Sequence, residues 1–344
     1  MLRETAFSAA VGLALLVAAP FLFDDIYTLT VLTIYGLLAL SLGFIWGFGG
    51  ILCFGQAAFF GLGAYGFAIA SINFADPWIA ALVSLIIPAL FAAALGAMLF
   101  YGRLSDVYLA VVTLVVTLIL FKFMNSTAGS AYKIGDARLG GFNGIPGFDT
   151  LTLPWDSSEY LINEYLYYFC ALILLLAYLG LRWLLTAPFG RILVGIRENE
   201  LRAELVGYDV RLVKTLAFAI GGMLAGLSGM LFANWAEIVT PALFSLSQSA
   251  EIIIWVIVGG AGSLLGPIVG AFALGALKFF LGQQTLVNNL FVLGSILVVT
   301  VLFLPRGIVP TLAPFFKKRR RRATAAGAGK RGGRNARRRL RHAR

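Results

Sequence analysis

The sequence has few charged residues, one histidine and two cysteines. Charged side chains make up 12% of its 344 residues, and hydrophobic side chains make up 60%. His342 lies close to the C-terminus, while Cys53 and Cys170 lie in apolar surroundings without CxxC spacing. This composition argues against a soluble enzyme, a histidine- or cysteine-based metal site and a disulfide framework. We expect both cysteines to be small core residues and the chain to hold no metal or other cofactor.

Long apolar segments dominate the chain, and its mean hydropathy is +0.90. About ten segments are long enough to cross, or nearly cross, a hydrocarbon core of about 30 Å. We therefore predict an all-α fold, a polytopic membrane helix bundle with about ten transmembrane segments. The first segment could instead be a cleaved signal peptide, but its length and the parity of the others favour a retained helix. The predicted segments are 6–23, 28–47, 57–73, 78–101, 107–124, 160–184, 212–235, 249–262, 265–282 and 287–304.

Positive charge is concentrated near the C-terminus. Of the 27 Lys and Arg residues, 14 lie within 317–344, which leaves 13 basic and 16 acidic residues elsewhere. We predict a transmembrane domain over 1–310 and a basic, disordered tail over 311–344. No aromatic residue follows Phe316 to stack on bases. We therefore expect the tail to contact anionic membrane lipid and not nucleic acid.

Short basic loops predict the orientation of the bundle. The connection at 102–106 and the loop at 185–211 carry arginines, and the positive-inside rule places such loops in the cytoplasm. Threading the segments from these loops places both termini in the cytoplasm. The loop at 125–159, whose net charge is negative, then lies outside.

The stretch 43–66 contains eight glycines, too many for a regular helix because each glycine weakens it. We predict a broken or re-entrant segment, which membranes tolerate only where it is buried in protein or lines a water-filled cavity. Transporters use such segments near their pathways, so these residues are candidates for either pathway lining or tight packing. The candidates are Gly55, Gln56, Gly61 and Gly63.

Acidic and basic residues alternate in the loop at 185–211. Spacings of four residues, as between Glu198 and Arg202, predict a short charged helix, and Gly207 is a natural residue to end it. Such a helix between two membrane spans either docks against a soluble partner or is a solvated connection. The pattern alone leaves both functions open.

Two consecutive stretches, GIRENELRAELVGYDV and KTLAFAIGGMLAGLSGML, begin at residues 195 and 214. They resemble the coupling-helix region of permease subunits in ABC importers, specifically the LivM-like family of branched-chain amino acid importers and its urea-importing relatives. GILCFGQAAFFGLGAY, GGFNGIPGF and IIIWVIVGGAGSLLGPIVGAF with LFLPRGI resemble the same family in the same order. The resemblance covers most of residues 25–310.

The resemblance implies a type II ABC importer-like fold in the bacterial inner membrane. It implies that a helix at about 195–207 inserts into a cleft of an ATP-binding subunit, although family members often have small residues at the position of Arg202. It also implies a LivH-like second permease subunit, two ATP-binding subunits and a periplasmic solute-binding protein. The matching coupling positions are Arg197, Glu198, Glu200, Glu204 and Gly207.

This chain is not expected to hydrolyse ATP. A P-loop needs Ser or Thr after its lysine to bind Mg²⁺, and the nearest string, GAGKRGG, has Arg331 there. We expect ATP and Mg²⁺ on the partner subunits. An intramembrane protease is also disfavoured, because the GLSG motif around Ser228 has no histidine in the bundle to serve as a base.

The expected substrate is a small polar solute, with branched-chain or related amino acids placed first. FGQAAFFGLGAY resembles the amino acid branch of the family, whereas Trp255 resembles its urea-importing relatives. A urea or short-chain amide permease therefore stays an alternative. An ion-coupled secondary transporter is a further alternative, since ionisable residues in the spans could form an ion path. These residues are Lys122, Glu164, Lys214, Glu237 and Glu251.

Overall fold

The computed structural model describes residues 25–282 apart from 75, 130 and 154–155, together with 294–295, 307–309 and 311. Apart from these few positions, the predicted spans at 6–23 and 287–304 and the tail at 311–344 lie outside the described residues. The prediction for each of those segments is therefore neither confirmed nor corrected.

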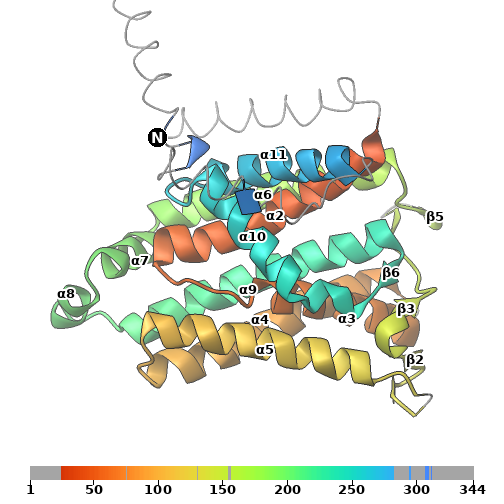
Figure 1. Cartoon of the computed structure of the whole chain (residues 1–344), viewed down its shortest axis with the longest axis horizontal. Coiled ribbons are helices and arrows are strands. Elements are labelled where there is room, and N and C mark those ends of the chain that lie inside the picture. The colour runs from red at the N-terminus through yellow and green to blue at the C-terminus, as the bar shows by residue number, and fades with distance from the viewer. Residues whose placement is uncertain are drawn as a thin grey trace, which may run out of the picture.

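The described chain is a helix bundle, as predicted (Figure 1). Six helices are long and apolar enough to cross a membrane, and two shorter apolar helices, α10 and α11, accompany them. The six are α2 (Ile26–Gly49), α3 (Gln56–Phe74), α4 (Pro77–Tyr101), α5 (Asp106–Ser126), α6 (Glu164–Thr186) and α9 (Val210–Ala236). The shorter two are α10 (Leu246–Gly259) and α11 (Leu265–Gly282).

Aspartates fix where several of these helices begin. Asp25 accepts hydrogen bonds from Thr28 at the start of α2, which lower the pKa of the Asp25 carboxyl below its usual value. Asp76 caps α4, whose first residue is Pro77, and Asp209 caps α9. A side-chain oxygen at this position satisfies a backbone N–H that has no partner within the helix. The apolar runs therefore start where the sequence offers a cap.

The connecting segments gather at two opposite ends of the bundle (Figure 1). One end carries α7 (Pro188–Glu198) and α8 (Glu200–Leu205), and we call it the α8 end. The other, the strand end, carries short antiparallel strand pairs and two 3₁₀ turns. The pairs are β1 (Lys133–Ile134) with β2 (Ala137–Arg138), β3 (Ile145–Pro146) with β6 (Ile238–Val239), and β4 (Thr152–Leu153) with β5 (Asp156–Tyr160); the turns are η1 (Gly141–Asn143) and η2 (Pro241–Phe244).

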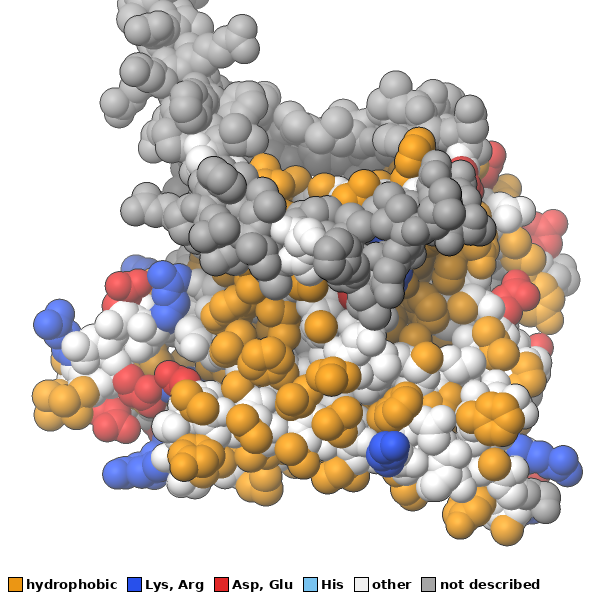
Figure 2. All heavy atoms as spheres, in the orientation of Figure 1, with side chains coloured by type: hydrophobic (Ala, Val, Ile, Leu, Met, Phe, Trp, Pro, Cys, Tyr) orange, Lys and Arg blue, Asp and Glu red, His pale blue; other side chains and the backbone are white. Residues whose placement is uncertain are grey.

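Helices α2, α3 and α9 form the inside of the bundle, while α5 and α6 are mostly exposed. Figure 2 shows hydrophobic side chains over the face between the two ends and charged side chains mostly at the ends. This distribution is what a bilayer requires of a spanning protein. Ser228 on α9 donates to the carbonyl oxygen of Ile34 on α2 at 2.8 Å, so the GLSG motif is a packing contact between helices.

The glycine-rich stretch is broken, as predicted. Gly50 ends α2 with a φ of 70°, and the chain then runs without regular structure to Gln56, where α3 begins. The Gln56 side chain bonds to Ser41, which lies eight residues, or about 12 Å, before the end of α2. Residues 50–55 therefore return from the α8 end into the bundle before α3 starts (Figure 1).

Candidate functional site

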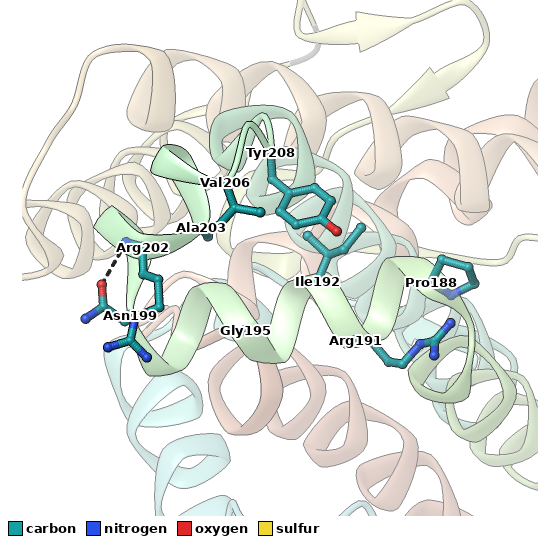
Figure 3. A pocket seen from close by; sticks show the side chains of 9 residues that line it. All are labelled: Pro188, Arg191, Ile192, Gly195, Asn199, Arg202, Ala203, Val206 and Tyr208. Atoms are coloured by element: carbon teal, nitrogen blue, oxygen red, sulfur yellow. Dashed lines mark hydrogen bonds between the residues drawn. The ribbon is translucent and has the colours of Figure 1, made fainter.

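The predicted loop helix consists of two helices instead of one. Asn199 adopts an extended backbone, with φ −161° and ψ 101°, between α7 and α8. Its side-chain oxygen accepts a hydrogen bond from the backbone N–H of Arg202 at 2.8 Å and caps α8 (Figure 3). The prediction of one helix joining Glu198 to Arg202 is therefore wrong, because Asn favours a cap over a helix interior. Gly207, with a φ of 97°, lies just beyond α8, as predicted for the residue that ends it.

The acidic residues of the loop have different surroundings. Glu200 pairs with Lys214 at the start of α9 at 2.5 Å, and Glu198 pairs with its neighbour Arg197 at 3.3 Å. Among the described residues Glu204 makes no ion pair; it lines a cavity of about 450 Å³ together with Arg211. The pair of Glu200 and Lys214 holds α8 to the bundle, whereas Glu204 is available to a partner.

Arg197 points toward the bundle. Its guanidinium Nη1 donates to the carbonyl oxygen of Gly47 near the end of α2, and its aliphatic part lies against Gly50. Leu193, one turn earlier on α7, is fully buried beside Gly49. Helix α7 is thus fixed to the end of α2.

Helix α8, by contrast, buries none of its residues. Leu201, Leu205 and Val206 are 67%, 80% and 70% exposed. Three exposed large apolar side chains with charged residues around them are typical of a protein interface, because a soluble surface rarely leaves such a group in water. The sequence interpretation named the charged residues of this loop and missed these three. The available signal was their spacing: Leu201 and Leu205 are four residues apart, which places them on the same side of a helix, and Val206 follows directly.

A groove of about 510 Å³ runs between α7 and α8. Figure 3 shows Val206 and Tyr208 facing Ile192 across it. Arg191 and Arg202 also line the groove. The loop thus presents an apolar projection beside a groove with basic edges, which suits a partner that offers apolar and acidic groups.

Gln56 joins three helices inside the bundle. Its side-chain Nε2 donates to Ser41 Oγ of α2 at 2.6 Å and to the carbonyl oxygen of Gly221 of α9 at 3.2 Å. The residue is 1% exposed, and its Oε1 has no hydrogen-bond partner among the residues that the structure describes. These contacts favour the packing interpretation of Gln56 over a role in lining an open pathway.

The three candidate glycines are also packing positions. A Cβ on Gly55 would lie 2.8 Å from the carbonyl oxygen of Thr113 on α5. A Cβ on Gly61 would overlap the ring of Phe244, and one on Gly63 would overlap the backbone of Gly226. At Gly63 glycine is needed because the backbones of α3 and α9 approach more closely than a side chain allows; at Gly55 and Gly61 a side chain would meet Thr113 and the Phe244 ring.

The ionisable residues proposed for an ion path are not brought together among the described residues. Lys122 lies four residues before the end of α5, Glu164 begins α6, Lys214 lies in the second turn of α9, and Glu237 follows α9. Only Glu251 lies within the bundle, and both of its carboxylate oxygens accept from Lys278 of α11 at 2.8 Å. The described chain gives the secondary-transporter alternative no support.

A family model described as the permease component of the branched-chain amino acid transport system matches residues 26–301. This chain belongs to that permease family. It is 31% identical over 329 residues to the high-affinity branched-chain amino acid transport system permease protein LivM of Escherichia coli K12, covering 89% of this chain and 75% of the relative. The LivM protein of Salmonella typhimurium LT2 is 30% identical with the same coverage.

A shorter match links the chain to a permease for another solute. The ribose import permease protein RbsC of Haemophilus influenzae is 27% identical over 96 residues, which cover 26% of this chain and 30% of that protein. No solved structure gives a significant match. The LivM-like resemblance of the sequence motifs is thereby confirmed, and the relatives are transport subunits, not enzymes. Membership implies a membrane protein that works in a complex with other subunits.

Proposed function

We propose that this chain is the permease subunit of an ATP-binding-cassette importer and translocates a small polar solute across the bacterial inner membrane. Branched-chain or related amino acids are the first substrate class, because the likeness to LivM extends over 89% of the chain. Trp255 does not favour urea: it is 1% exposed and packs against Tyr35, with 4.9 Å between the ring centroids. Uptake of leucine, urea and short amides, each with the cognate binding protein, tests the substrate class.

The proposed complex contains a LivH-like second permease subunit, two ATP-binding subunits that hold ATP and Mg²⁺, and a periplasmic solute-binding protein. The α8 end lies in the cytoplasm in this arrangement, since its loops carry the arginines at 103, 191, 197 and 202. The strand end faces the periplasm. Both termini lie in the cytoplasm.

The exposed apolar residues of α8 carry the proposed contact with the ATP-binding subunit. Fully burying a Leu or Val side chain contributes about 1.5–3 kcal/mol, so burial of Leu201, Leu205 and Val206 against the partner favours association. Glu204, at the edge of this apolar group, sets the register of docking through its charge. Gly207 allows the chain to turn back toward α9, because its φ of 97° suits glycine.

We expect the double variant Leu201→Asp, Leu205→Asp to lose the ATP-binding subunit while still entering the membrane. Two carboxylates would have to be desolvated in the contact, which opposes association. Co-purification of the ATP-binding subunit should fall at least tenfold, and uptake should fall with it. The measurement is the amount of ATP-binding subunit that remains with the tagged permease in detergent.

Ile134→Asp is the matched control, because Ile134 is 52% exposed but lies in β1 at the opposite end of the bundle. This control should retain the ATP-binding subunit. Wild-type co-purification of the double variant would disprove docking through α8.

A further inference from the structure

The loop at the α8 end divides into a helix held by the bundle and a helix exposed to solvent. Helix α7 buries Gly190, Leu193 and Ile196, whereas α8 buries nothing. Only Asn199 separates them. A force applied to α8 by a docked partner therefore reaches the bundle through α7 on one side and through α9, where Lys214 pairs with Glu200, on the other.

Arg197 is the main polar contact between α7 and the bundle. Gly47 is among the last four residues of α2, whose carbonyl oxygens have no partner within the helix, and Arg197 Nη1 donates to that oxygen. The positive charge also suits the C-terminal end of a helix dipole. Arg197 Nη2 pairs with Glu198 at the same time, and the planar guanidinium presents these donors in a fixed fork, which an ammonium lacks.

The same arginine rests on the residue where α2 ends. A Cβ on Gly50 would lie 2.9 Å from Arg197 Cγ, and Gly50 closes α2 in the left-handed conformation. The segment 50–55 begins at this contact, with Gly50 as its first residue. Any displacement of Arg197 therefore acts on the first residue of the returning segment.

The returning segment ends among three other helices. The backbone N–H of Phe54 donates to Thr113 Oγ1 of α5 at 3.2 Å, and Gln56 bonds α2 and α9. Contacts thus run without interruption from α7 through Arg197 and residues 50–55 to α3, α5 and α9. Chains of packed and hydrogen-bonded groups of this kind carry coupling between distant sites.

We propose that Arg197 is a positioning residue that connects the coupling loop to the segment 50–55, so that movement of the docked loop shifts the start of α3. This gives Arg197 a role on the inner side of the loop, where it contacts α2 while 39% of its side chain is exposed. The proposal rests on the proposed function, because it requires an ATP-binding subunit at α8.

Cys53 provides a direct readout of the segment. It is fully buried within residues 50–55, and the other cysteine of the chain, Cys170, can be replaced by Ala to leave it as the only thiol. The experiment uses the assembled transporter in membranes, with this permease carrying Cys170→Ala and with cysteine-free partner subunits. The rate of Cys53 modification by a methanethiosulfonate reagent is measured without nucleotide and after trapping with ATP and vanadate.

We expect trapping to change the Cys53 modification rate at least threefold when Arg197 is present. In Arg197→Gln the ATP-binding subunit should stay bound, but the rate should be the same in both states and uptake should fall at least tenfold. Arg197→Lys should restore part of the nucleotide response, since it keeps the charge but lacks the fixed planar fork of the guanidinium. If Arg197 had a purely structural role, Arg197→Gln would change the Cys53 modification rate by the same factor with and without nucleotide. The response to nucleotide would then persist.

The proposal is overturned if Arg197→Gln keeps the wild-type nucleotide response and wild-type uptake. It is also overturned if the wild-type transporter is active but its Cys53 modification rate does not change with nucleotide. If Arg197→Gln fails to insert, Arg197→Lys decides: unchanged uptake and response overturn the proposal, and a loss of at least threefold with normal assembly supports it. A wild-type chain that binds no ATP-binding subunit would refute the proposed function itself.

Discussion

Gly63→Leu is expected to abolish uptake and to lower the amount of folded protein in the membrane. Helices α3 and α9 cross at this point, and a Cβ on Gly63 would overlap the carbonyl group and Cα of Gly226. The obstacle is backbone, which cannot rotate away as a side chain can. Inserting extra methylenes into a well-packed core already costs about 1–3 kcal/mol, so a branched side chain against backbone should separate the helices.

Gly180→Leu is the control for this substitution. Gly180 lies on α6, where a new Cβ would meet nothing within 4 Å. Both variants therefore make the same increase in side-chain size and hydrophobicity within a helix. They differ only in whether the new side chain meets a neighbouring helix. Membrane yield, partner co-purification and uptake should stay near wild type in Gly180→Leu. Equal behaviour of the two variants would show that close packing at Gly63 is not required.

The sequence predicts the membrane helices well because their signal is local. The expected spans 78–101 and 107–124 correspond to Pro77–Tyr101 and Asp106–Ser126, since an uninterrupted apolar run of sufficient length has few other structures available in a membrane. Two-residue strands have no such signal. The pairing of β3 with β6 joins Ile145 to Val239, residues brought together only by the folded bundle.

The coupling loop shows what local patterns leave undetermined. Glu198 and Arg202 have helical spacing, but Asn199 between them can continue a helix or start a new one, and the difference is about 1 kcal/mol. The contacts of Leu193 and Arg197 with the end of α2 fix the direction of α7. Charge alone likewise could not show that Arg197 faces inward while Leu205 faces outward, because those directions depend on the packing of α2.

Lys278→Met is expected to destabilise the bundle more than the removal of both charges. Glu251 is 6% exposed, and both of its carboxylate oxygens bond to Lys278 at 2.8 Å. Without the lysine, a charge would remain buried between α10 and α11 without a partner among the described residues. Breaking a buried pair from one side costs about 3–5 kcal/mol, and the lower end applies here because the Lys278 side chain is 35% exposed. Reversible unfolding in mixed micelles measures the loss.

The double variant Glu251→Gln, Lys278→Met removes both charges and should recover most of the lost stability, since replacing a whole buried pair is often close to neutral. The comparison also separates folding from transport. A stable double variant with normal uptake would assign the pair to the packing of α10 on α11. A stable double variant without uptake would instead mean that an intramembrane charge takes part in the transport cycle, as buried ionisable residues in membranes often do. Equal stability of Lys278→Met and wild type would contradict the prediction, because Glu251 would then be satisfied without Lys278.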